Sequence, residues 1–174
     1  VTYAKERLQG RALTGAKEAS KAADPIIVHP DVRRPLMQIR AFIAGARALV
    51  LWTALQADIS HRSQDEKERE AAEDHLGLMT PVVKGVLTDR GFANAVEAQQ
   101  MFGGHGYVEE WGMSQFVRDA RIAMIYEGTN GIQALDLVGR KMPAHAGRYL
   151  RSFFHPVSDF IEANKADETF GKMI

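Results

Sequence analysis

Three short motifs in the 174-residue chain hold residue types that could take part in chemistry. Residues 100–107 combine a glutamine with three glycines, residues 118–121 read Arg-Asp-Ala-Arg, and residues 126–133 place Glu127 between a tyrosine and a glycine. Glu127 is the candidate acid or base, because it follows the apolar run 122–126 and precedes a residue that lets a ligand come close. Burial there would raise its pKa by desolvation, and a carboxylate that titrates nearer neutrality can serve as a general base.

Simpler explanations exist for the same residues, and the sequence leaves them open. An acidic residue just ahead of a helix is favoured by the helix dipole, which explains Glu127 without catalysis. Gly103 and Gly104 at the end of a helical pattern fit a C-cap with no ligand role. Thr129 or Asn130 can cap the helix that follows, and the free N–H groups of that helix N-terminus would favour an anion such as pyrophosphate.

The long elements that must position these motifs are predicted to be helices. Residues 1–13 suit the last turns of a helix, and residues 14–30 suit an irregular connection that contains two prolines. The first long helix carries an apolar stripe at steps of three and four. A second runs from Glu68 to Met101, with a kink or break expected at Pro81. The stripe comprises Leu36, Ile39, Ile43, Ala46, Val50, Ala54 and Ala57.

Shorter elements complete the predicted fold. If the second long helix breaks at Pro81, Thr80 is the candidate N-cap of the helix that restarts there. Further helices are expected at 114–121 and 129–140. The apolar segment 122–126 between them is expected to be extended. Two long helices joined by a short charged turn should run antiparallel. The predicted fold class is therefore all-α, an up-and-down helical bundle.

Composition excludes several classes of function. The 22 basic and 22 acidic residues cancel, so no net charge attracts nucleic acid or an anionic membrane. With no cysteine the chain has no disulfide, thiolate zinc site or catalytic thiol, in agreement with a reducing compartment. His29 and His105 lack partners at metal-ligand spacing, so no metal site is predicted. The most apolar stretch, 41–55, contains Arg47 and is shorter than the roughly 20 residues that cross a bilayer, so no membrane span is predicted.

Taken together, the motifs resemble the C-terminal helical domain of the acyl-CoA dehydrogenase family, flavoproteins that oxidise acyl-CoA thioesters to trans-2-enoyl-CoA. Residues 100–107 are similar to the family's Q-x-x-G-G-x-G-aromatic loop, residues 118–121 to its R-D-A-[RK], and residues 126–129 to its Y-E-G-T around the catalytic base. Residues 6–10, Glu-Arg-Leu-Gln-Gly, are similar to the element that closes the preceding family helix. The resemblance covers roughly residues 1–141.

The resemblance implies a role for each matching residue. Glu127 corresponds to the base that removes the pro-R α-proton while hydride leaves Cβ for flavin N5, and Gly128 corresponds to a substrate contact. The residues implied to contact FAD are Arg7, Gln9, Gln100, Met101, Phe102, Gly103 and Gly104 at the adenosine and pyrophosphate portion, with Thr129, Asn130 and Gly131 elsewhere. This family holds FAD across a subunit interface, which implies a homo-oligomer. The other implied partners are an acyl-CoA substrate and electron-transfer flavoprotein or a similar acceptor, in a bacterial cytoplasm or a mitochondrial matrix.

The chain also departs from the common family pattern. His29-Pro30 stands where many relatives have His-Gln, and the insertion at 14–27 with the extension at 144–174 is similar to a longer branch that acts on short or sulfur-containing acyl-CoAs. The expected domains are a helical bundle at 1–142 with a truncated first helix, and the start of a C-terminal extension or additional domain at 143–174. Because the family's N-terminal helical domain and β-domain have no counterpart here, we expect a fragment that is inactive alone. The alternatives are an acyl-CoA oxidase with the same base and a non-catalytic helical interaction module.

Overall fold

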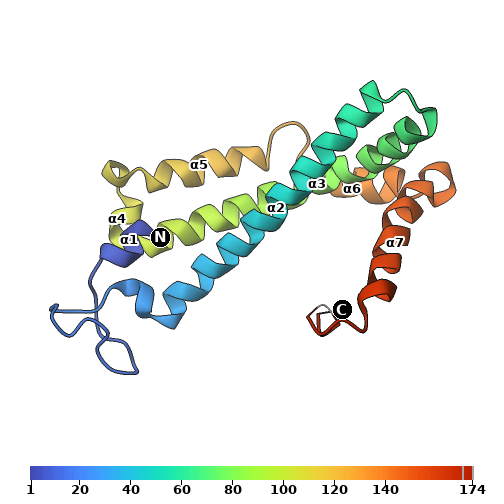
Figure 1. Ribbon diagram of the computed structural model, residues 1–174. Coiled ribbons are helices and arrows are strands. Elements are labelled where there is room, and N and C mark those ends of the chain that lie inside the picture. Colours follow the sequence, from blue (N-terminus) through green and yellow to red (C-terminus); the bar gives the residue numbers. More distant parts are fainter. Residues whose placement is uncertain (170, 174) are drawn as a thin grey trace. The chain divides into compact units, whose positions relative to one another are not determined.

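The computed structural model describes residues 1–169 and 171–173, and helices are the only regular elements in that part of the chain (Figure 1). The predicted all-α class is therefore confirmed. The elements in chain order are α1 (Thr2–Glu6), η1 (Ile26–Val28), α2 (Pro30–Arg62), α3 (Glu66–Met101), α4 (Gly104–Tyr107), η2 (Glu109–Trp111), α5 (Met113–Ala123), α6 (Asn130–Asp136), η3 (Leu137–Lys141) and α7 (Ala144–Asn164).

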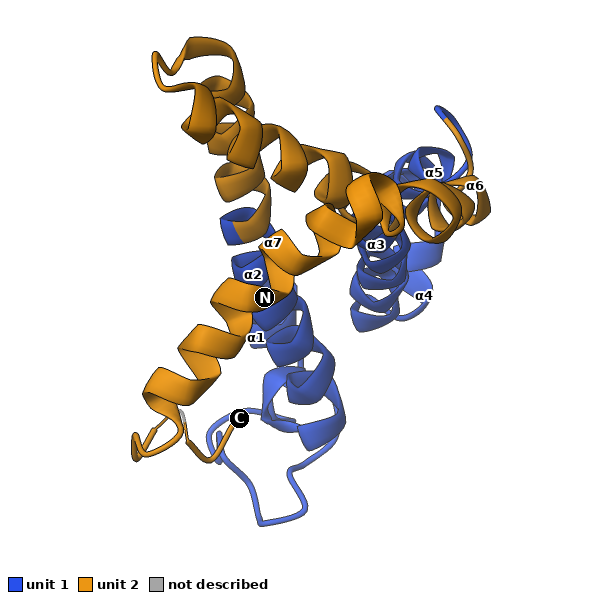
Figure 2. Cartoon of the chain, turned by 90° about the vertical axis from the view of Figure 1, so that its right-hand side faces the viewer, with its two compact units in different colours: residues 1–48, 86–127 blue, residues 49–85, 128–174 orange. Residues whose placement is uncertain are grey.

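The chain forms two compact units, each assembled from segments that are distant in sequence (Figure 2). Unit 1 comprises Val1–Ala48 and Val86–Glu127, and unit 2 comprises Leu49–Gly85 and Gly128–Ile174. The two long helices α2 and α3 contribute residues to both units. The domain limits expected from the sequence, 1–142 and 143–174, stay a prediction.

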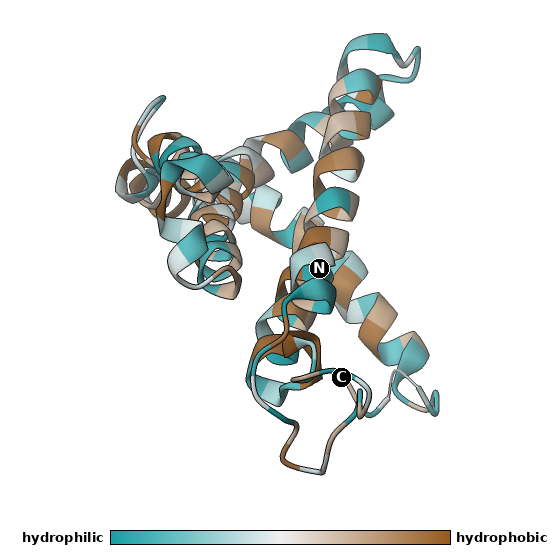
Figure 3. Cartoon of the chain, turned by 90° about the vertical axis from the view of Figure 1, so that its left-hand side faces the viewer, coloured by the Kyte–Doolittle hydropathy of each residue, from teal (hydrophilic) through white to brown (hydrophobic). Residues whose placement is uncertain are grey.

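Helix α2 forms as predicted, but its apolar stripe is not fully buried. The helix begins at Pro30, where the missing N–H costs no helical hydrogen bond, and His61 and Arg62 in its last turn suit the helix dipole. Ile43 is 47% exposed and Val50 is 40% exposed, because few described residues pack on this side. Figure 3 shows hydrophobic residues along the helix surfaces.

Length and apolar composition alone would let α2 cross a membrane, which differs from the prediction made on residues 41–55. This is weak support for a span, because the core helices of soluble proteins pass the same test.

Of the kink or break predicted at Pro81, the break is wrong, and the kink stays a prediction. Helix α3 continues through Pro81, which is buried, so packing holds the two halves together although one helical donor is lost. Thr80 does not act as an N-cap; its hydroxyl donates to the Leu76 carbonyl at 2.7 Å, one turn back along the same helix.

Residues 122–126 do not form the predicted extended segment. Helix α5 runs on to Ala123, and the N–H groups of Ile125 and Tyr126 then donate to the Ile122 carbonyl at 2.9 and 3.2 Å. These donors stay in helical turns, and no strand among the described residues offers them a partner.

In unit 2, helix α7 is attached to α3 by Arg148. Its guanidinium donates to Glu70 at 2.6 Å and to Asp74 at 2.8 Å, and the Asp74 side chain is only 7% exposed. The hydrogen bond that Arg148 donates to Asp74 raises the pKa of Arg148 above its ordinary value. Gly77 gives α7 further room, since a Cβ there would lie 2.5 Å from the ring of Tyr149.

Arg148→Met is expected to loosen α7, because it leaves the nearly buried Asp74 carboxylate without its cation. We expect a thermal midpoint lower by a few degrees and faster amide exchange across residues 148–160. Arg62→Met is the matched control, since Arg62 pairs with Asp58 at 3.7 Å and both side chains are mostly exposed. Equal exchange in the two variants would contradict the anchoring role of Arg148.

Candidate functional site

A ring cluster joins α1 to the far end of α3 within unit 1. The Tyr3 ring stacks on Phe102 with centroids 4.2 Å apart, and Trp111 stacks on His105 at 4.6 Å. The Tyr3 hydroxyl lies 3.3 Å from the Phe102 carbonyl, to which it donates, and 3.1 Å from His105 Nδ1. These contacts bring the first residues of the chain against a loop about a hundred positions later.

The docked segments enclose a cavity of about 730 Å³. Its lining includes all seven residues that the resemblance assigns to the adenosine and pyrophosphate portion of FAD: Arg7, Gln9, Gln100, Met101, Phe102, Gly103 and Gly104. Its other lining residues include His29 and Asp31. The structure thus places these seven residues together, although 91 positions separate Gln9 from Gln100.

The cavity offers donors suited to a phosphate. Arg7 provides a guanidinium, and Gln9 and Gln100 provide amide N–H groups. At Gly104 a Cβ would meet no atom within 4 Å, so the backbone at the cavity wall is open to a ligand. The Asp31 carboxylate is the one feature of this lining that disfavours an anion.

Gly106 sits in a crowded turn next to this open wall. A Cβ there would lie 2.3 Å from the Gln99 carbonyl oxygen, while the Gln99 amide donates to the Gly106 carbonyl at 3.0 Å. Gly103 caps α4 with a φ of 57°, a left-handed value that favours glycine. The glycines of residues 103–106 thus serve two purposes, close packing at Gly106 and an open surface at Gly104.

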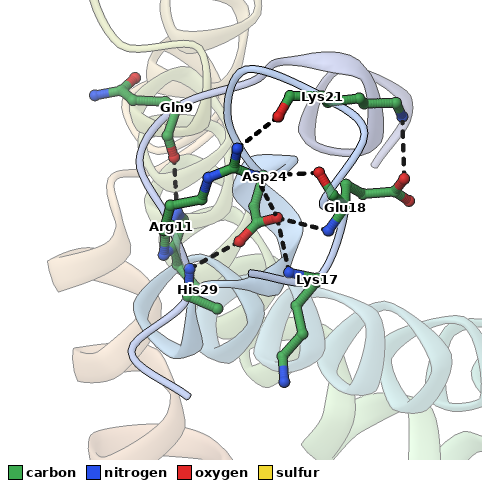
Figure 4. Close-up of polar contacts among 8 residues, drawn as sticks. Gln9, Arg11, Lys17, Glu18, Lys21, Asp24 and His29 are labelled. Carbon is green, nitrogen blue, oxygen red and sulfur yellow. Dashed lines mark hydrogen bonds and ion pairs between the residues drawn. The ribbon is translucent and has the colours of Figure 1, made fainter. Parts of the chain in front are cut away.

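Asp24 organises the irregular connection that forms another side of the cavity (Figure 4). Its carboxylate is fully buried and accepts hydrogen bonds from the N–H groups of Ala12 at 2.9 Å, Lys17 at 2.9 Å and Glu18 at 2.8 Å. The Arg11 guanidinium adds a contact at 3.3 Å. The hydrogen bond from Ala12, followed by those from Glu18, Lys17 and Arg11, lowers the pKa of Asp24 from 3.8 to about 2, against the opposing effect of burial.

The same connection fixes the cavity residues Gln9 and His29. The Gln9 N–H donates to the Asp24 carbonyl at 2.9 Å, and the Asp24 N–H donates to the Gly10 carbonyl at 2.9 Å. His29 Nε2 lies 2.8 Å from the Gln9 carbonyl, which can only accept, so this nitrogen carries the proton. Sequence reasoning treated this stretch as a plain connection and missed Asp24.

Glu127 occupies an unusual backbone turn. Its φ is 52° and that of Gly128 is 82°, so two successive residues are left-handed. A left-handed residue that is not glycine costs about 1 kcal/mol or more, and such strain often marks functional sites. The hydroxyl of Thr129 then accepts from the Ile132 N–H at 3.4 Å, which makes Thr129 the N-cap of α6.

The expected burial of Glu127 is not met within this chain. Its side chain is exposed, and the neighbouring apolar residues Ile122, Ile125 and Tyr126 are 54, 47 and 53% exposed. An apolar run is buried only where another surface packs on it, and the described residues cover only about half of these three side chains. The desolvation invoked from the sequence is therefore absent in this structure.

The Glu127 turn is anchored by Lys84 of α3, which sequence reasoning also missed. Lys84 Nζ donates to the Gly128 carbonyl at 2.6 Å and to Asn130 Oδ1 at 2.7 Å. Asn130 Nδ2 in turn donates to the Gly85 carbonyl at 3.3 Å.

Gly128, Asn130 and Gly131 lie in unit 2, whereas the seven cavity residues lie in unit 1. The described residues contain no group of three acidic or histidine side chains that could hold a metal ion.

The comparison with known families decides which proteins this chain is related to. Residues 4–142 match the family described as "Acyl-CoA dehydrogenase, C-terminal domain". The chain belongs to the acyl-CoA dehydrogenase family. All three motifs fall inside the matched range, as do all the lining residues of the unit 1 cavity except Tyr3.

Individual acyl-CoA dehydrogenases show the same relation. The chain is 43% identical over 153 residues to the 3-methylmercaptopropionyl-CoA dehydrogenase of Ruegeria pomeroyi, covering 88% of this chain and 25% of that protein. It is 37% identical over 166 residues to the broad-specificity linear acyl-CoA dehydrogenase FadE5 of Mycobacterium tuberculosis, covering 92% of this chain and 26% of the relative. The chain therefore spans about a quarter of the length of these curated relatives.

A solved structure supports the fold. The Caenorhabditis elegans protein ACDH-11, crystallised in complex with C11-CoA, superposes with a TM-score of 0.77 at 22% identity, over 96% of this chain and 25% of that one. At this identity the likeness establishes the helical fold of the family and nothing finer.

Proposed function

We propose that this chain is the C-terminal helical domain of an FAD-dependent acyl-CoA dehydrogenase that oxidises acyl-CoA to trans-2-enoyl-CoA. The observation that carries the proposal is the Glu127 turn, a carboxylate on a strained left-handed backbone within the Y-E-G-T motif of a family member. A glycine at position 127 would relieve this backbone strain, yet the chain has a glutamate there. A carboxylate that the reaction requires explains why a strained residue stands at this position.

In this reaction Glu127 takes the α-proton of the thioester as its Cα–H bond breaks. Bound FAD supplies the acceptor for the hydride that leaves Cβ, so that the two departures leave a Cα–Cβ double bond. Gly128 follows the base with a φ of 82° and is proposed to contact the substrate. Hydrogen bonds to the thioester oxygen acidify the α-position, and exclusion of water strengthens the carboxylate as a base.

We propose that other domains of the full-length protein exclude water from the Glu127 carboxylate. Glu127 is exposed in this chain, which spans about a quarter of the length of its relatives, so other domains are proposed to close over it. This requirement explains why we expect the chain alone to be inactive.

The unit 1 cavity is proposed to hold the adenosine and pyrophosphate portion of FAD. Its guanidinium, its two amides and its open glycine backbone fit such a group. Following the family resemblance, we propose that FAD is bound across the interface between two subunits, so that the active protein is a homo-oligomer. Thr129, Asn130 and Gly131 are proposed to contact FAD at the N-terminus of α6.

An anaerobic substrate panel on the full-length flavoprotein tests the proposal. Saturated acyl-CoAs, including butyryl-CoA and 3-methylmercaptopropionyl-CoA, are expected to bleach the flavin, and electron-transfer flavoprotein or a similar acceptor to restore its colour. Rapid reoxidation in air with release of peroxide would instead identify an acyl-CoA oxidase. Absence of bleaching with every substrate would favour a non-catalytic helical interaction module.

Gly104 in the cavity wall and Gly106 beside it allow a matched test of FAD binding. Gly104→Ala is expected to leave the thermal midpoint of the FAD-free full-length protein unchanged, because its Cβ meets nothing, yet to lower FAD content at purification at least about tenfold. Gly106→Ala is expected to lower the thermal midpoint itself, because its Cβ would contact backbone at 2.3 Å. Normal FAD content in Gly104→Ala would remove this part of the wall from the FAD site.

A further inference from the structure

Lys84 makes two short polar contacts to the segment that follows Glu127. Its Nζ donates to the Gly128 carbonyl at 2.6 Å and to Asn130 Oδ1 at 2.7 Å, across 44 and 46 positions of sequence. Lys84 is half-buried, so these charge-assisted bonds are less open to water than those of a surface lysine. The ammonium of α3 therefore fixes one backbone carbonyl and one side chain of the turn.

Asn130 extends the attachment to the next residue of α3. Its amide accepts from Lys84 through Oδ1 and donates to the Gly85 carbonyl through Nδ2 at 3.3 Å. A Cβ on Gly85 would lie 3.9 Å from Cβ of Gln133, so α6 approaches α3 closely at this point. Gln133 adds a donor to the Gly128 carbonyl at 3.5 Å. Three side chains thus hold a stretch of only a few residues.

The hydrogen bond from Lys84 to the Gly128 carbonyl restricts the backbone conformation of Gly128 and Glu127. Fixing the Gly128 carbonyl fixes ψ of Gly128, whose φ is 82°, and so limits the angles open to the peptide that joins it to Glu127. Without that restraint a non-glycine residue at φ 52° would relax toward the right-handed or extended regions, which are lower in energy.

We propose that Lys84 is a positioning residue that keeps Glu127 and Gly128 in their left-handed conformations, so that the Glu127 carboxylate is presented in one orientation to the substrate. Lys84 touches neither substrate nor FAD in this role; it acts through Gly128 and Asn130. The catalytic consequence rests on the proposed function of Glu127, whereas the structural consequence for the turn does not.

The test compares Lys84→Met, Lys84→Arg and Lys67→Met in the full-length, FAD-loaded protein. Lys84→Met removes the donors but keeps the length of the side chain, and Lys84→Arg restores a cationic donor. Lys67 lies on the same helix and is exposed, so Lys67→Met controls for the loss of one lysine from α3. The measurements are kcat, KM for acyl-CoA, FAD content, and amide hydrogen exchange at residues 127–132.

Lys84→Met is expected to lower kcat about 100-fold, since small misplacements of a reacting group have effects of this size, with KM within about threefold and FAD content lowered by a much smaller factor than kcat, because Asn130 loses one of its contacts. Exchange at residues 127–132 is expected to become faster, Lys84→Arg to restore both readouts in part, and Lys67→Met to match the wild type. A kcat and an exchange pattern equal to the wild type in Lys84→Met would overturn the proposal.

Two other outcomes separate this inference from the proposed function. Faster exchange at residues 127–132 in a protein whose wild type oxidises no acyl-CoA would sustain the anchoring role while removing the catalytic one. Equal proportional losses of kcat, FAD content and thermal stability in Lys84→Met would overturn positioning in favour of a general structural role.

Discussion

Glu127→Gln in the full-length, FAD-loaded protein is expected to lower the turnover of saturated acyl-CoA by roughly 10²- to 10⁴-fold, the range of a lost general base. Glutamine keeps the shape of the side chain and cannot accept the α-proton. FAD content and the affinity for enoyl-CoA product are expected to stay near wild-type values, because the change removes a base and not a binding surface. Steady-state assays with an artificial acceptor, together with single-turnover flavin bleaching, measure the loss.

Glu110→Gln is the control for this substitution, since Glu110 is an exposed carboxylate of unit 1 and lies outside the Y-E-G-T motif. It is expected to leave turnover unchanged. If Glu127→Gln retained the turnover of Glu110→Gln, the assignment of the base would fail, and the family membership of the chain would have to be reconciled with a non-catalytic role.

Asp24→Asn is expected to have the largest effect on the structure of unit 1. The substitution replaces an acceptor of four hydrogen bonds by an amide whose NH2 group faces either the Ala12 N–H or the N–H groups of Lys17 and Glu18, depending on its orientation. We expect a thermal midpoint lower by at least several degrees and fast amide exchange at these three residues. Because the same connection holds Gln9 and His29 at the cavity, FAD content should fall as well.

Asp58→Asn is a suitable control for Asp24→Asn. Asp58 forms an exposed ion pair with Arg62 at 3.7 Å, of the kind that contributes little to stability. Its loss is expected to leave both the thermal midpoint and the FAD content unchanged. A midpoint for Asp24→Asn that equals this control would show that the connection does not depend on the buried carboxylate.

The lowered pKa of Asp24 also predicts how stability changes with acid. Its pKa is about 2 in the folded chain against 3.8 ordinarily, so the unfolded chain binds the proton more readily. The contribution of Asp24 is therefore complete above about pH 4 and is lost as the pH falls toward 2. Urea unfolding at several pH values between 2 and 6 should show a decline in this window that is smaller in Asp24→Asn.

The sequence was sufficient to predict the helices and to place the motifs, because both depend on residues that are close along the chain. The apolar period predicted α2, the glycines marked the end of α3, and Thr129 was one of two candidate caps for α6. Pro81 was expected to interrupt α3, but a proline removes only one hydrogen bond, and its burial kept the helix continuous.

Lys84 and Asp24 could not be found in the same way. Lys84 acts on residues 44 and 46 positions away, and no local spacing signals a bond over that distance. Asp24 precedes a proline within the predicted irregular connection, whereas its importance comes from the N–H donors of Ala12, Lys17 and Glu18 that fold around it. Glu127 was expected to be buried because an apolar run precedes it, yet burial depends on what packs on that run and not on the run itself.

The unit 1 cavity forms only when Tyr3, near the start of the chain, packs on Phe102. Its walls meet only after a loop of about a hundred residues has closed, which carries an entropic cost that local contacts do not share. Any ligand that binds the closed form stabilises it by mass action, in proportion to the logarithm of its concentration relative to Kd. Under the proposed function, FAD binding and closure of this cavity are thermodynamically linked, and loss of FAD should first release α1 from Phe102.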